Sequence, residues 1–408
     1  MRFSSNSFNT QDMHGNIDRS ARKIISIQYA LYFGTLGVFL PYFNLYCYHL
    51  GFNGVQIGTL SSLRSVILVS FALAWGVVAD RFHIRKQLYI ACNIISTLIW
   101  GLYFFTDTFW TMFLITACYG IFYAPIIAFL EAFSMDLLES GKSGYGGIRV
   151  WGSIAFIGVV TTVGWALGWL PIKDILVFIF VGGVLLSLVG LKMPAAAGAS
   201  KIPFWKSIKA FMNRRVAVFL FCAFLMLAGH GAYYGFFSIY LDSLGFGSSF
   251  IGFAWALAII AEIAVMINSK RIFRVLSLEK ALAASFIIAV LRWVLLGTLQ
   301  AWYALLLLQI LHAGTYAMFH MASILYMDQL SPDGAKTLGQ SINNAMTYGL
   351  GLMAGFFISG FLYERAGAPF TFMVSALLAF LGGVVFLTFR WLDRGHAATP
   401  SRDIAKKA

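Results

Sequence analysis

Charged residues are scarce in this chain. Asp, Glu, Lys and Arg make up 11% of its 408 residues, whereas hydrophobic residues make up 60%. An ordinary soluble domain holds about 25% charged residues, so the composition excludes that class. The sequence also has no Gly-rich phosphate loop, no nucleophile elbow and no His–Glu metal motif. We therefore expect neither an enzyme nor an ATP-driven pump, and we expect no metal or organic cofactor.

Cysteine is equally rare, and its four positions are scattered singly in or beside apolar segments: Cys47, Cys92, Cys118 and Cys222. Their spacing matches neither a metal site nor a redox pair, so we interpret them as packing residues. Residues 1–23 have no apolar core of the kind found in a cleavable signal peptide. The first apolar segment is therefore expected to remain in the mature protein.

Long apolar runs are what the chain has instead. A helix of about 20 residues spans the ~30 Å hydrocarbon core of a bilayer. Six such runs precede residue 192, at about 25–46, 55–79, 88–105, 109–135, 147–167 and 172–191. Six more follow residue 215, at about 216–241, 248–269, 281–299, 303–328, 337–362 and 369–392. The stretch between the two sets holds six Lys and Arg.

This six-plus-six arrangement is typical of secondary transporters built from two related bundles. We predict an all-α integral membrane protein with twelve transmembrane helices in two six-helix bundles, residues 24–191 and 216–392. A basic cytoplasmic linker, 192–215, joins the bundles, and cytoplasmic tails, 1–23 and 393–408, flank them. A small-molecule substrate is expected to bind at the midplane, where the bundles rock against each other in alternating access.

The distribution of positive charge predicts the orientation. Segments assigned to the cytoplasm hold 24 of the 29 Lys and Arg, whereas the outer loops hold only Lys173 and Arg365. This asymmetry follows the positive-inside rule and places both termini in the cytoplasm. The basic residues that produce the net charge of +13 then face the cytoplasmic leaflet, which is usually anionic. The positive charge therefore does not imply a nucleic-acid partner. The oligomeric state is not indicated, and a monomer is compatible with the sequence.

The most specific local motif lies between the second and third runs and reads Gly76-Val-Val-Ala-Asp80-Arg81-Phe-His-Ile-Arg85-Lys86. It resembles the signature loop of the major facilitator superfamily, and most closely the variant in the lactose permease branch. Asp80 can approach the amide end of a neighbouring helix or pair with a base, and so latch one conformation. His83 stands where that family usually has glycine. We assign conformational gating to five residues: Gly76, Asp80, Arg81, Arg85 and Lys86. In the alternative, the bases only anchor the loop at the headgroups.

Charges inside the hydrocarbon are costly, so each is expected to be paired or to face a watery cavity. Glu131 and Arg149 each lie nine residues from position 140, so they sit at similar depth near the cytoplasmic ends of neighbouring runs. Lactose permease has a Glu and an Arg with the same separation of 18 residues, which bind substrate and each other. The resemblance implies substrate binding here. A structural salt bridge, with Asp136 or Glu139 as an equally good partner, is the alternative.

Arg64 lies near the midplane of the first half without an acid on its own helix. Among the deep charges, Arg64, Arg292 and Glu262 leave a surplus of one positive charge. Such a surplus suits an anionic substrate, so Arg64 is a candidate substrate-binding residue. The alternative is that Arg64 pairs with Glu131, which would cancel the argument.

Glu262, Arg292 and His312 lie roughly 12, 18 and 16 Å from the inner boundary, and we predict that they converge in one polar cluster. Glu262 is the only acid near the middle of this half, so it is assigned the coupled proton. Arg292 would balance its charge, and His312 would relay the proton or donate to substrate. The 20-residue Arg–His separation matches lactose permease, where both take part in proton coupling, although Thr315 replaces its later carboxylate. A permanent Glu262–Arg292 pair that only fixes packing is the alternative.

Four further segments resemble the phenylpropionate-transporter branch of the superfamily: Tyr145-Gly-Gly-Ile-Arg149-Val-Trp151-Gly152-Ser153, Trp255-Ala-Leu-Ala-Ile-Ile-Ala-Glu262, Leu291-Arg292-Trp293 and Gln309-Ile-Leu-His312-Ala-Gly-Thr-Tyr-Ala-Met-Phe-His320. That branch is close to lactose permease and the nucleoside proton symporters. The resemblance implies proton-coupled uptake of an aromatic carboxylate such as 3-phenylpropionate across a bacterial inner membrane. Sugar or nucleoside symport, proton-antiport efflux and a non-transporting membrane sensor remain open.

A few remaining residues receive weaker interpretations. Trp151 and Phe156 are the first candidates for stacking on a substrate ring, with packing as the alternative for both. His320 lies near the inner surface and His230 has no evident partner, so neither is assigned a role. A stripe of glycines in the eleventh run permits close helix packing; its members are Gly351, Gly355 and Gly360.

Overall fold

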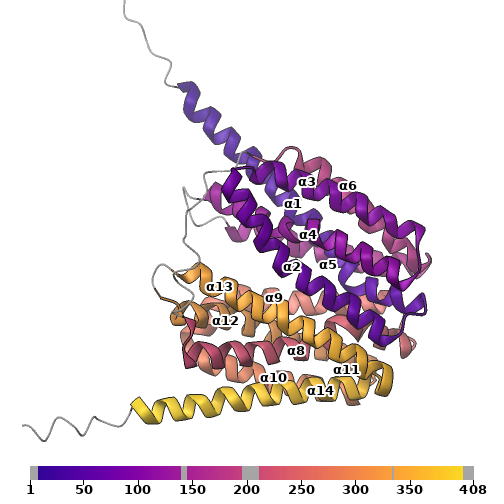
Figure 1. Ribbon diagram of the computed structural model, residues 1–408, viewed down its shortest axis with the longest axis vertical. Coiled ribbons are helices and arrows are strands. Elements are labelled where there is room, and N and C mark those ends of the chain that lie inside the picture. Colours follow the sequence, from indigo (N-terminus) through magenta and orange to yellow (C-terminus); the bar gives the residue numbers. More distant parts are fainter. Residues whose placement is uncertain (1–7, 139–144, 195–210, 333–334, 398–408) are drawn as a thin grey trace, which may run out of the picture. The chain divides into compact units, whose positions relative to one another are not determined.

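The computed structural model describes residues 8–138, 145–194, 211–332 and 335–397 (Figure 1), and within these ranges the chain is helical and has no strand. The α-helices of the first half are α1 (Phe8–His49), α2 (Gly54–Phe82), α3 (Arg85–Trp100), α4 (Phe109–Leu138), α5 (Tyr145–Ala166) and α6 (Ile175–Gly190). Those of the second half are α8 (Arg214–Ser243), α9 (Ser248–Val275), α10 (Leu278–Thr298), α11 (Trp302–Ile310), α12 (Met318–Leu330), α13 (Lys336–Asn344) and α14 (Leu352–Ala397). Parts of the predicted linker and tails, and Glu139, lie outside the described residues.

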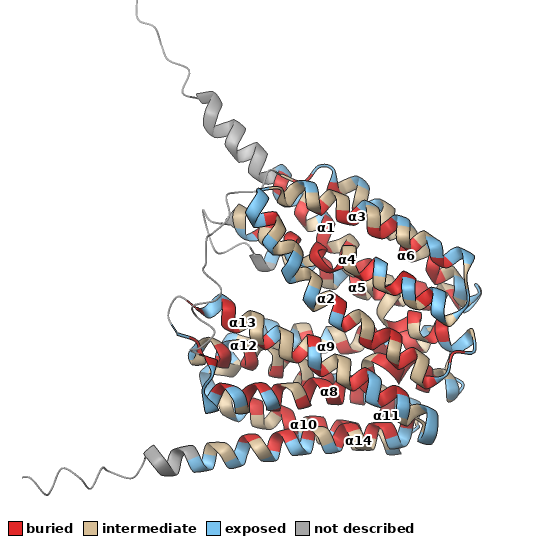
Figure 2. Cartoon of the chain, viewed as in Figure 1, coloured by how far each residue is buried: buried red, intermediate tan, exposed pale blue. Residues whose placement is uncertain are grey.

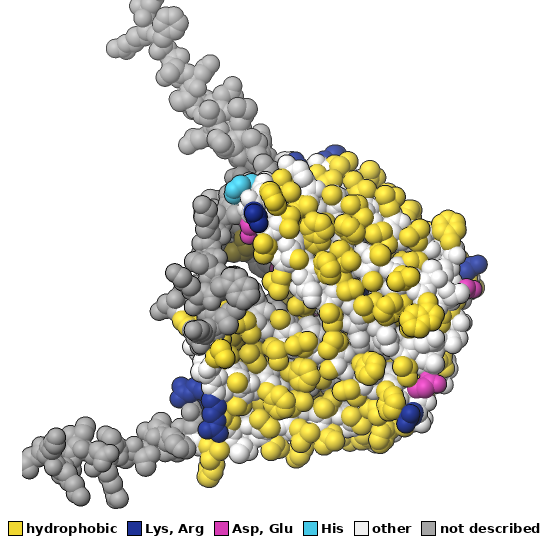
Figure 3. All heavy atoms as spheres, in the orientation of Figure 1, with side chains coloured by type: hydrophobic (Ala, Val, Ile, Leu, Met, Phe, Trp, Pro, Cys, Tyr) yellow, Lys and Arg dark blue, Asp and Glu magenta, His cyan; other side chains and the backbone are white. Residues whose placement is uncertain are grey.

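The helices expose apolar side chains on their outer surfaces, as expected for helices surrounded by lipid. Eleven helical segments of the described part are long and apolar enough to cross a membrane. Large hydrophobic side chains remain exposed along them, as on Leu98, and hydrophobic atoms crowd the face drawn in Figure 3. Figure 2 shows buried and exposed positions alternating along the same helices. The protein is therefore a multi-pass membrane protein.

The last of the eleven segments, residues 336–392, explains why the number differs from the predicted twelve. It contains 57 residues and would be about 85 Å long as one straight helix, nearly three bilayer cores. Gly367 inside it has φ 73° and ψ −179°, which is not a helical conformation, and Pro369 follows. This break coincides with the loop predicted between 362 and 369. Twelve crossings remain a prediction.

The chain divides into two compact units. Unit 1 comprises residues 1–202 with 234–260, and unit 2 comprises residues 203–233 with 261–408. Helices α8 and α9 therefore each contribute residues to both units. The predicted bundle boundaries at 191 and 216 remain a prediction, and the two units are described separately below.

The core of unit 1 forms where α1 packs against α5 and α6, and where α2 and α3 pack against α4. Tyr29 and Tyr32 of α1, Tyr89 of α3 and Phe133 of α4 are buried in one hydrophobic cluster. Gln28 lies among them, and it is satisfied because its Nε2 donates to the Leu186 carbonyl while its Oε1 accepts from Tyr89. A buried amide that is hydrogen-bonded at both its nitrogen and its oxygen favours this register of the helices.

Unit 1 also contains a tight junction between α1, α5 and the start of α9. The buried Tyr42 hydroxyl lies 3.2 Å from both the Val160 and the Ser248 carbonyl oxygens. Gly164 and Gly252 flank this hydroxyl, and a Cβ added to either would lie within 2.6 Å of it. Glycine at both positions is what allows the two helices and the phenol to meet.

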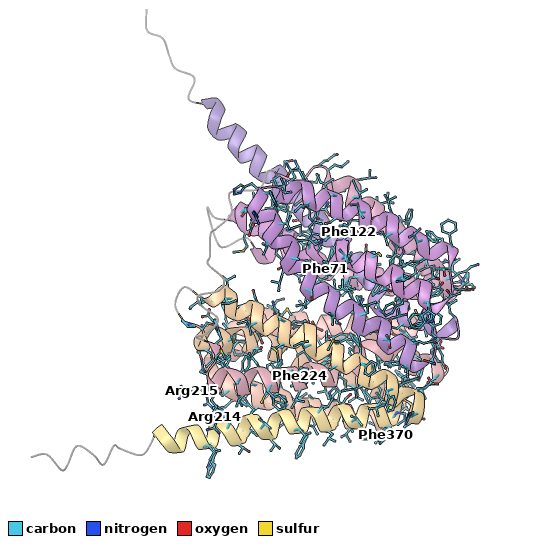
Figure 4. The ribbon with its side chains drawn as sticks, in the orientation of Figure 1. Phe71, Phe122, Arg214, Arg215, Phe224 and Phe370 are labelled. Atoms are coloured by element: carbon cyan, nitrogen blue, oxygen red, sulfur yellow. The ribbon has the colours of Figure 1, made fainter. Side chains whose placement is uncertain are left out.

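In unit 2, the predicted glycine stripe packs against α8. A Cβ on Gly355 would lie 2.3 Å from the Ala228 carbonyl oxygen, and one on Gly351 would lie 3.0 Å from that of Phe224, which is labelled in Figure 4. Helix α10 packs against α12 and α14 in the same unit. This packing brings the backbones of α8 and the 336–392 segment into direct contact.

Two π-helical turns interrupt the helices of unit 2. The first, η5 (Ala313–Ala317), separates α11 from α12, and the second, η6 (Ala345–Gly351), separates α13 from α14. A π turn has i→i+5 hydrogen bonds in place of the i→i+4 bonds of an α-helix, and it is rare in proteins. Such turns occur frequently at functional sites, and His312 directly precedes η5.

Candidate functional site

Unit 2 contains a buried cluster of charged and imidazole side chains. Glu262 of α9 is 6% exposed, Arg292 of α10 is 0% exposed, and His312, between α11 and η5, is 1% exposed. These are the three residues to which proton coupling was assigned. The structure brings all of them together.

Hydrogen bonds anchor each nitrogen of the Arg292 guanidinium. Its Nε donates to the Leu308 carbonyl at 3.0 Å, its Nη1 donates to His312 Nδ1 at 3.0 Å, and its Nη2 donates to Gln309 Oε1 at 3.2 Å. The guanidinium carbon also lies 4.3 Å from the centre of the Tyr233 ring. Acceptors and an aromatic face together compensate for the loss of water around this buried cation.

The contact with Arg292 determines the tautomer of His312. A guanidinium can only donate, so His312 Nδ1 must be the unprotonated acceptor. The ring proton is then on Nε2, which lies 3.0 Å from Glu262 Oε1 and donates to it. A second proton on His312 would require breaking the bond from Arg292. Within this arrangement Glu262, and not His312, is the group that can take up a proton.

His230 belongs to the edge of the same cluster, although the sequence indicated no partner for it. Its Nδ1 lies 2.8 Å from the Met226 carbonyl and therefore donates. Its Nε2 lies 3.4 Å from Thr315 Oγ1, and the Thr315 hydroxyl donates to the His312 carbonyl oxygen at 3.2 Å. Thr315, which replaces the carboxylate of lactose permease, thus connects His230 with the backbone at His312.

A row of rings leads away from His312 along its helix. The Tyr316 ring stacks on His312 at 5.3 Å, and the His320 ring stacks on Tyr316 at 5.9 Å. The Tyr348 hydroxyl from η6 lies 2.7 Å from His320 Nδ1. Tyr316, His320 and Tyr348 are half-buried, whereas the three residues of the charged cluster are buried. Polar groups therefore continue from the cluster to a more accessible place.

Arg64 is the central cation of unit 1. It is half-buried on α2, and its guanidinium carbon lies 4.4 Å from the centre of the Phe39 ring. Within the part of the chain that the structure describes, no carboxylate lies within 4.0 Å of it, so the alternative pairing with Glu131 is not formed. The charge of Arg64 is left for another partner.

Three tyrosines form a stack near Arg64. The Tyr32 and Tyr123 rings are 5.4 Å apart and nearly parallel, and the Tyr119 and Tyr123 rings are 4.9 Å apart. All three lie within electrostatic range of the guanidinium. The combination offers a cation for an anionic group and flat apolar faces for a ring.

Glu131 and Arg149 do not form the contact ion pair that the resemblance implied. Arg149 instead covers the Phe33 ring at 4.1 Å and the Tyr29 ring at 5.4 Å. Glu131 is exposed, and it senses the charge of Arg149 only at longer range. Asp136, the alternative partner of Arg149, is occupied by Arg85 at 2.7 Å.

The two aromatic candidates beside Arg149 differ in their surroundings. Trp151 is 50% exposed on α5, whereas Phe156 is 3% exposed. A Cβ on Gly37 would lie 3.0 Å from the Phe156 carbonyl oxygen, so the backbone at Phe156 packs directly on α1. Packing therefore accounts for Phe156, and the rings on which Arg149 rests come from α1.

The signature loop follows α2. His83, at the position of the family's glycine, adopts the left-handed conformation with φ 55° and ψ 37° and caps the helix by donating its N–H to the Ala79 carbonyl. Arg85 then reaches both Asp136 at 2.7 Å and Asp80 at 3.6 Å. Among the other gating candidates, Gly76 has open space around it, Arg81 lies over the Phe82 ring, and Lys86 is the second residue of α3. The loop thus joins α2, α3 and α4 through one arginine.

Comparison with known proteins places this chain. A family model described as "MFS_1 like family" matches residues 23–374. The chain belongs to the MFS_1-like family. Among the relatives of this MFS_1-like protein, a probable 3-phenylpropionic acid transporter of Escherichia coli (strain K12) is 28% identical over 365 residues and covers 87% of this chain and 94% of its own length. A maltose permease of Geobacillus stearothermophilus is 20% identical and covers 92% and 96%.

Solved structures agree with this assignment. The crystal structure of the nucleoside transporter NupG superimposes with a TM-score of 0.81 at 20% identity, covering 90% of this chain and 98% of that one. At that identity the likeness shows the fold alone. The MFS_1-like protein is thus a membrane transporter of the major facilitator type and not an enzyme. The predicted resemblance and the all-helical membrane class are confirmed.

Several site residues were not found from the sequence. Tyr233 and Gln309, which both support Arg292, hydrogen-bond each other although they are 76 residues apart in the sequence. Tyr348 and His320 are likewise in contact although they are 28 residues apart. One signal was present: His312, Tyr316 and His320 are spaced four residues apart, which places them along one helical face. The tyrosine stack beside Arg64 had no comparable signal among 39 Phe and 18 Tyr.

Proposed function

We propose that this MFS_1-like transporter is a proton symporter for a small organic anion, with an aromatic carboxylate as the best substrate class. It would cross a bacterial inner membrane twelve times with both termini in the cytoplasm, and it would work by alternating access of two bundles. The observation that carries the proposal is the chain of contacts from Arg292 through His312 to Glu262. Along that chain, the buried Glu262 carboxylate is the group that can take up a proton.

Charge balance favours joint transport of a proton and an anion. In the empty carrier, Glu262 offsets Arg292, and Arg64 remains positive. In the loaded carrier, a protonated Glu262 leaves Arg292 positive, and the substrate anion offsets Arg64. The carrier thus has the same net charge in both states, and moving a constant charge through hydrocarbon avoids the large penalty of an added one.

Arg64 and its tyrosine stack support the substrate class. A guanidinium binds a carboxylate through two parallel hydrogen bonds, and Tyr32, Tyr119 and Tyr123 present ring faces to an apolar group. The relative named as a probable 3-phenylpropionic acid transporter supports the same choice. Nucleosides and sugars, to which the names of other relatives refer, carry no charge and would leave Arg64 uncompensated.

The decisive experiment follows protons and substrate in the same vesicles. Purified protein is reconstituted into de-energised, inside-neutral proteoliposomes, 3-phenylpropionate is added outside, and external pH is recorded. Symport predicts alkalinisation that saturates with substrate, because each anion enters with a proton. Passive entry of the free acid has the same sign, so the signal is the excess over protein-free vesicles.

Variants separate the proton from the substrate. Glu262→Gln is expected to lose the saturable alkalinisation while still exchanging labelled for unlabelled substrate. Asp174→Asn, which changes an acid in an outer 3₁₀ turn, is the matched control and should behave as wild type. Wild-type protein that exchanges 3-phenylpropionate without moving protons would refute symport. A response to a nucleoside or maltose alone would refute the substrate class, and acidification would indicate antiport.

A further inference from the structure

We propose that Tyr348 and His320 form the inner end of the proton pathway, through which the proton on Glu262 leaves toward the cytoplasm. This inference rests on the proposed proton symport and its orientation. The charged cluster explains how a proton is held, but its three members are buried and offer no way out. Tyr348 and His320 are the half-buried polar groups that continue from it.

Contacts join the pair to the row of rings that begins at His312. The Tyr348 hydroxyl lies 2.7 Å from His320 Nδ1, the Tyr316 ring stacks on the rings of both His320 and His312, and His312 Nε2 lies 3.0 Å from Glu262 Oε1. The titratable groups around the pair are therefore Tyr316 on the helix of His320 and, beyond it, His312 and Glu262 of the charged cluster. A phenol both accepts and donates a proton, and an imidazole does the same through its two nitrogens.

Both π turns of unit 2 contribute a tyrosine to this row. Tyr316 lies in η5, and its ring is 16° from parallel with that of His312 and 5° from parallel with that of His320. The second turn, η6, contains Tyr348. Each π turn thus places one tyrosine of this pathway.

For release, the Glu262 carboxyl comes within hydrogen-bond reach of Tyr348 Oη and gives it a proton, and the same oxygen gives its own proton to His320 Nδ1. One O–H bond breaks and one forms at the phenol, Glu262 becomes a carboxylate that again accepts from His312 Nε2, and His320 becomes an imidazolium. His320 then releases a proton from Nε2 to inner water, and exchange with water restores its starting tautomer. No other reactant is required.

The test compares two assays in the same proteoliposomes. Substrate exchange at equal pH cycles the carrier with its proton bound, so it does not need proton release. Uptake driven by an acidic outside needs release in every cycle. We expect Tyr348→Phe and His320→Gln to keep wild-type exchange and to lose about tenfold or more of the driven uptake. Tyr303→Phe, which removes an exposed hydroxyl on α11, is the matched control and should change neither.

A third variant keeps the proposal testable if these substitutions disturb the fold. His320→Ala should regain driven uptake when imidazole is added inside the vesicles, because imidazole replaces the missing acceptor and a merely structural residue would not respond. Unchanged driven uptake in Tyr348→Phe, or no rescue of a correctly inserted His320→Ala, would overturn the pathway. If wild-type protein shows no uptake driven by acid outside, the proposed symport itself fails, and that result is distinct from the failure of the pathway alone.

Discussion

Arg292 Nη1 donates to His312 Nδ1 at 3.0 Å, and this bond makes His312 a neutral donor toward Glu262. The histidine is held between a group that only donates and a group that accepts. It therefore connects a fixed charge with a variable one without titrating itself. Arg292 and His312 thus orient the carboxylate, and Glu262 carries the proton.

A glutamine should substitute for His312 better than an apolar residue. In His312→Gln the side-chain oxygen can accept from Arg292 while the amide donates to Glu262, which reproduces the observed tautomer. We expect proton-driven uptake within about tenfold of wild type, as for one weakened hydrogen bond. His312→Leu leaves both neighbours unsatisfied and should cost about 10- to 100-fold, measured as initial rates at equal protein insertion.

The pH dependence of exchange provides an independent check of that role. Exchange needs the protonated carboxyl, so wild-type exchange should fall as pH rises through the ionisation of Glu262. His312→Gln should show the same alkaline fall, because Glu262 is still the titrating group, whereas Glu262→Gln should be flat. A flat profile in His312→Gln would mean that the imidazole itself carries the proton.

Arg64 should discriminate charged from neutral ligands. Loss of a charge-assisted hydrogen bond costs about 1.5–3 kcal/mol, so Arg64→Gln should weaken binding of 3-phenylpropionate by about 10- to 100-fold. Binding of the neutral amide of the same acid, weak in wild type, should change little. Competition against labelled substrate measures both ligands, and Lys173→Gln in the 3₁₀ turn formed by residues Ile172–Asp174 is the control. Equal losses for the acid and the amide would show that Arg64 only supports packing.

The depth of a residue was predictable from sequence, whereas its partner was not. A helix rises ~1.5 Å per residue whatever its contacts, so counting from the ends of the runs placed Glu262, Arg292 and His312 at similar depth. Depth does not determine the direction in which a side chain points. Glu131 and Arg149 share a depth, yet Arg149 rests on the rings of Phe33 and Tyr29.

Features that depend on irregular backbone conformation also could not be predicted from the helical periodicity of the sequence. Tyr348, which contacts His320, lies in a π turn, and His320 follows another one; no helical periodicity indicates where the extra residue of such a turn is accommodated. The left-handed conformation of His83 is similar: the resemblance indicated a glycine position, but only the structure shows that a histidine occupies it with φ 55°.

The left-handed conformation of His83 is expected to lower the stability of the protein. A side chain in the left-handed region costs roughly 1–2 kcal/mol, a cost that glycine does not have. His83→Gly should therefore leave the thermal unfolding temperature in detergent unchanged or raise it. His83→Val, whose branched side chain is least compatible with positive φ, should lower it. A marked loss of stability in His83→Gly would show that the imidazole makes a contact on which the loop depends.

The junction at Tyr42 should be sensitive to a single methyl group. In Gly252→Ala the added Cβ would lie 2.5 Å from the Val160 carbonyl oxygen and 2.6 Å from the Tyr42 hydroxyl, so α9 must move away from α1 and α5. Overpacking of this kind costs about 1–3 kcal/mol, and the unfolding temperature should fall. Gly247→Ala is the matched control, because a Cβ there meets nothing within 4 Å. Tyr42→Phe, which removes the hydroxyl that crowds both glycines, should partly restore stability to Gly252→Ala. If Gly252→Ala melts with the wild type, the backbone at this junction is free to separate, and the close approach of α5 and α9 contributes little to the stability of the unit.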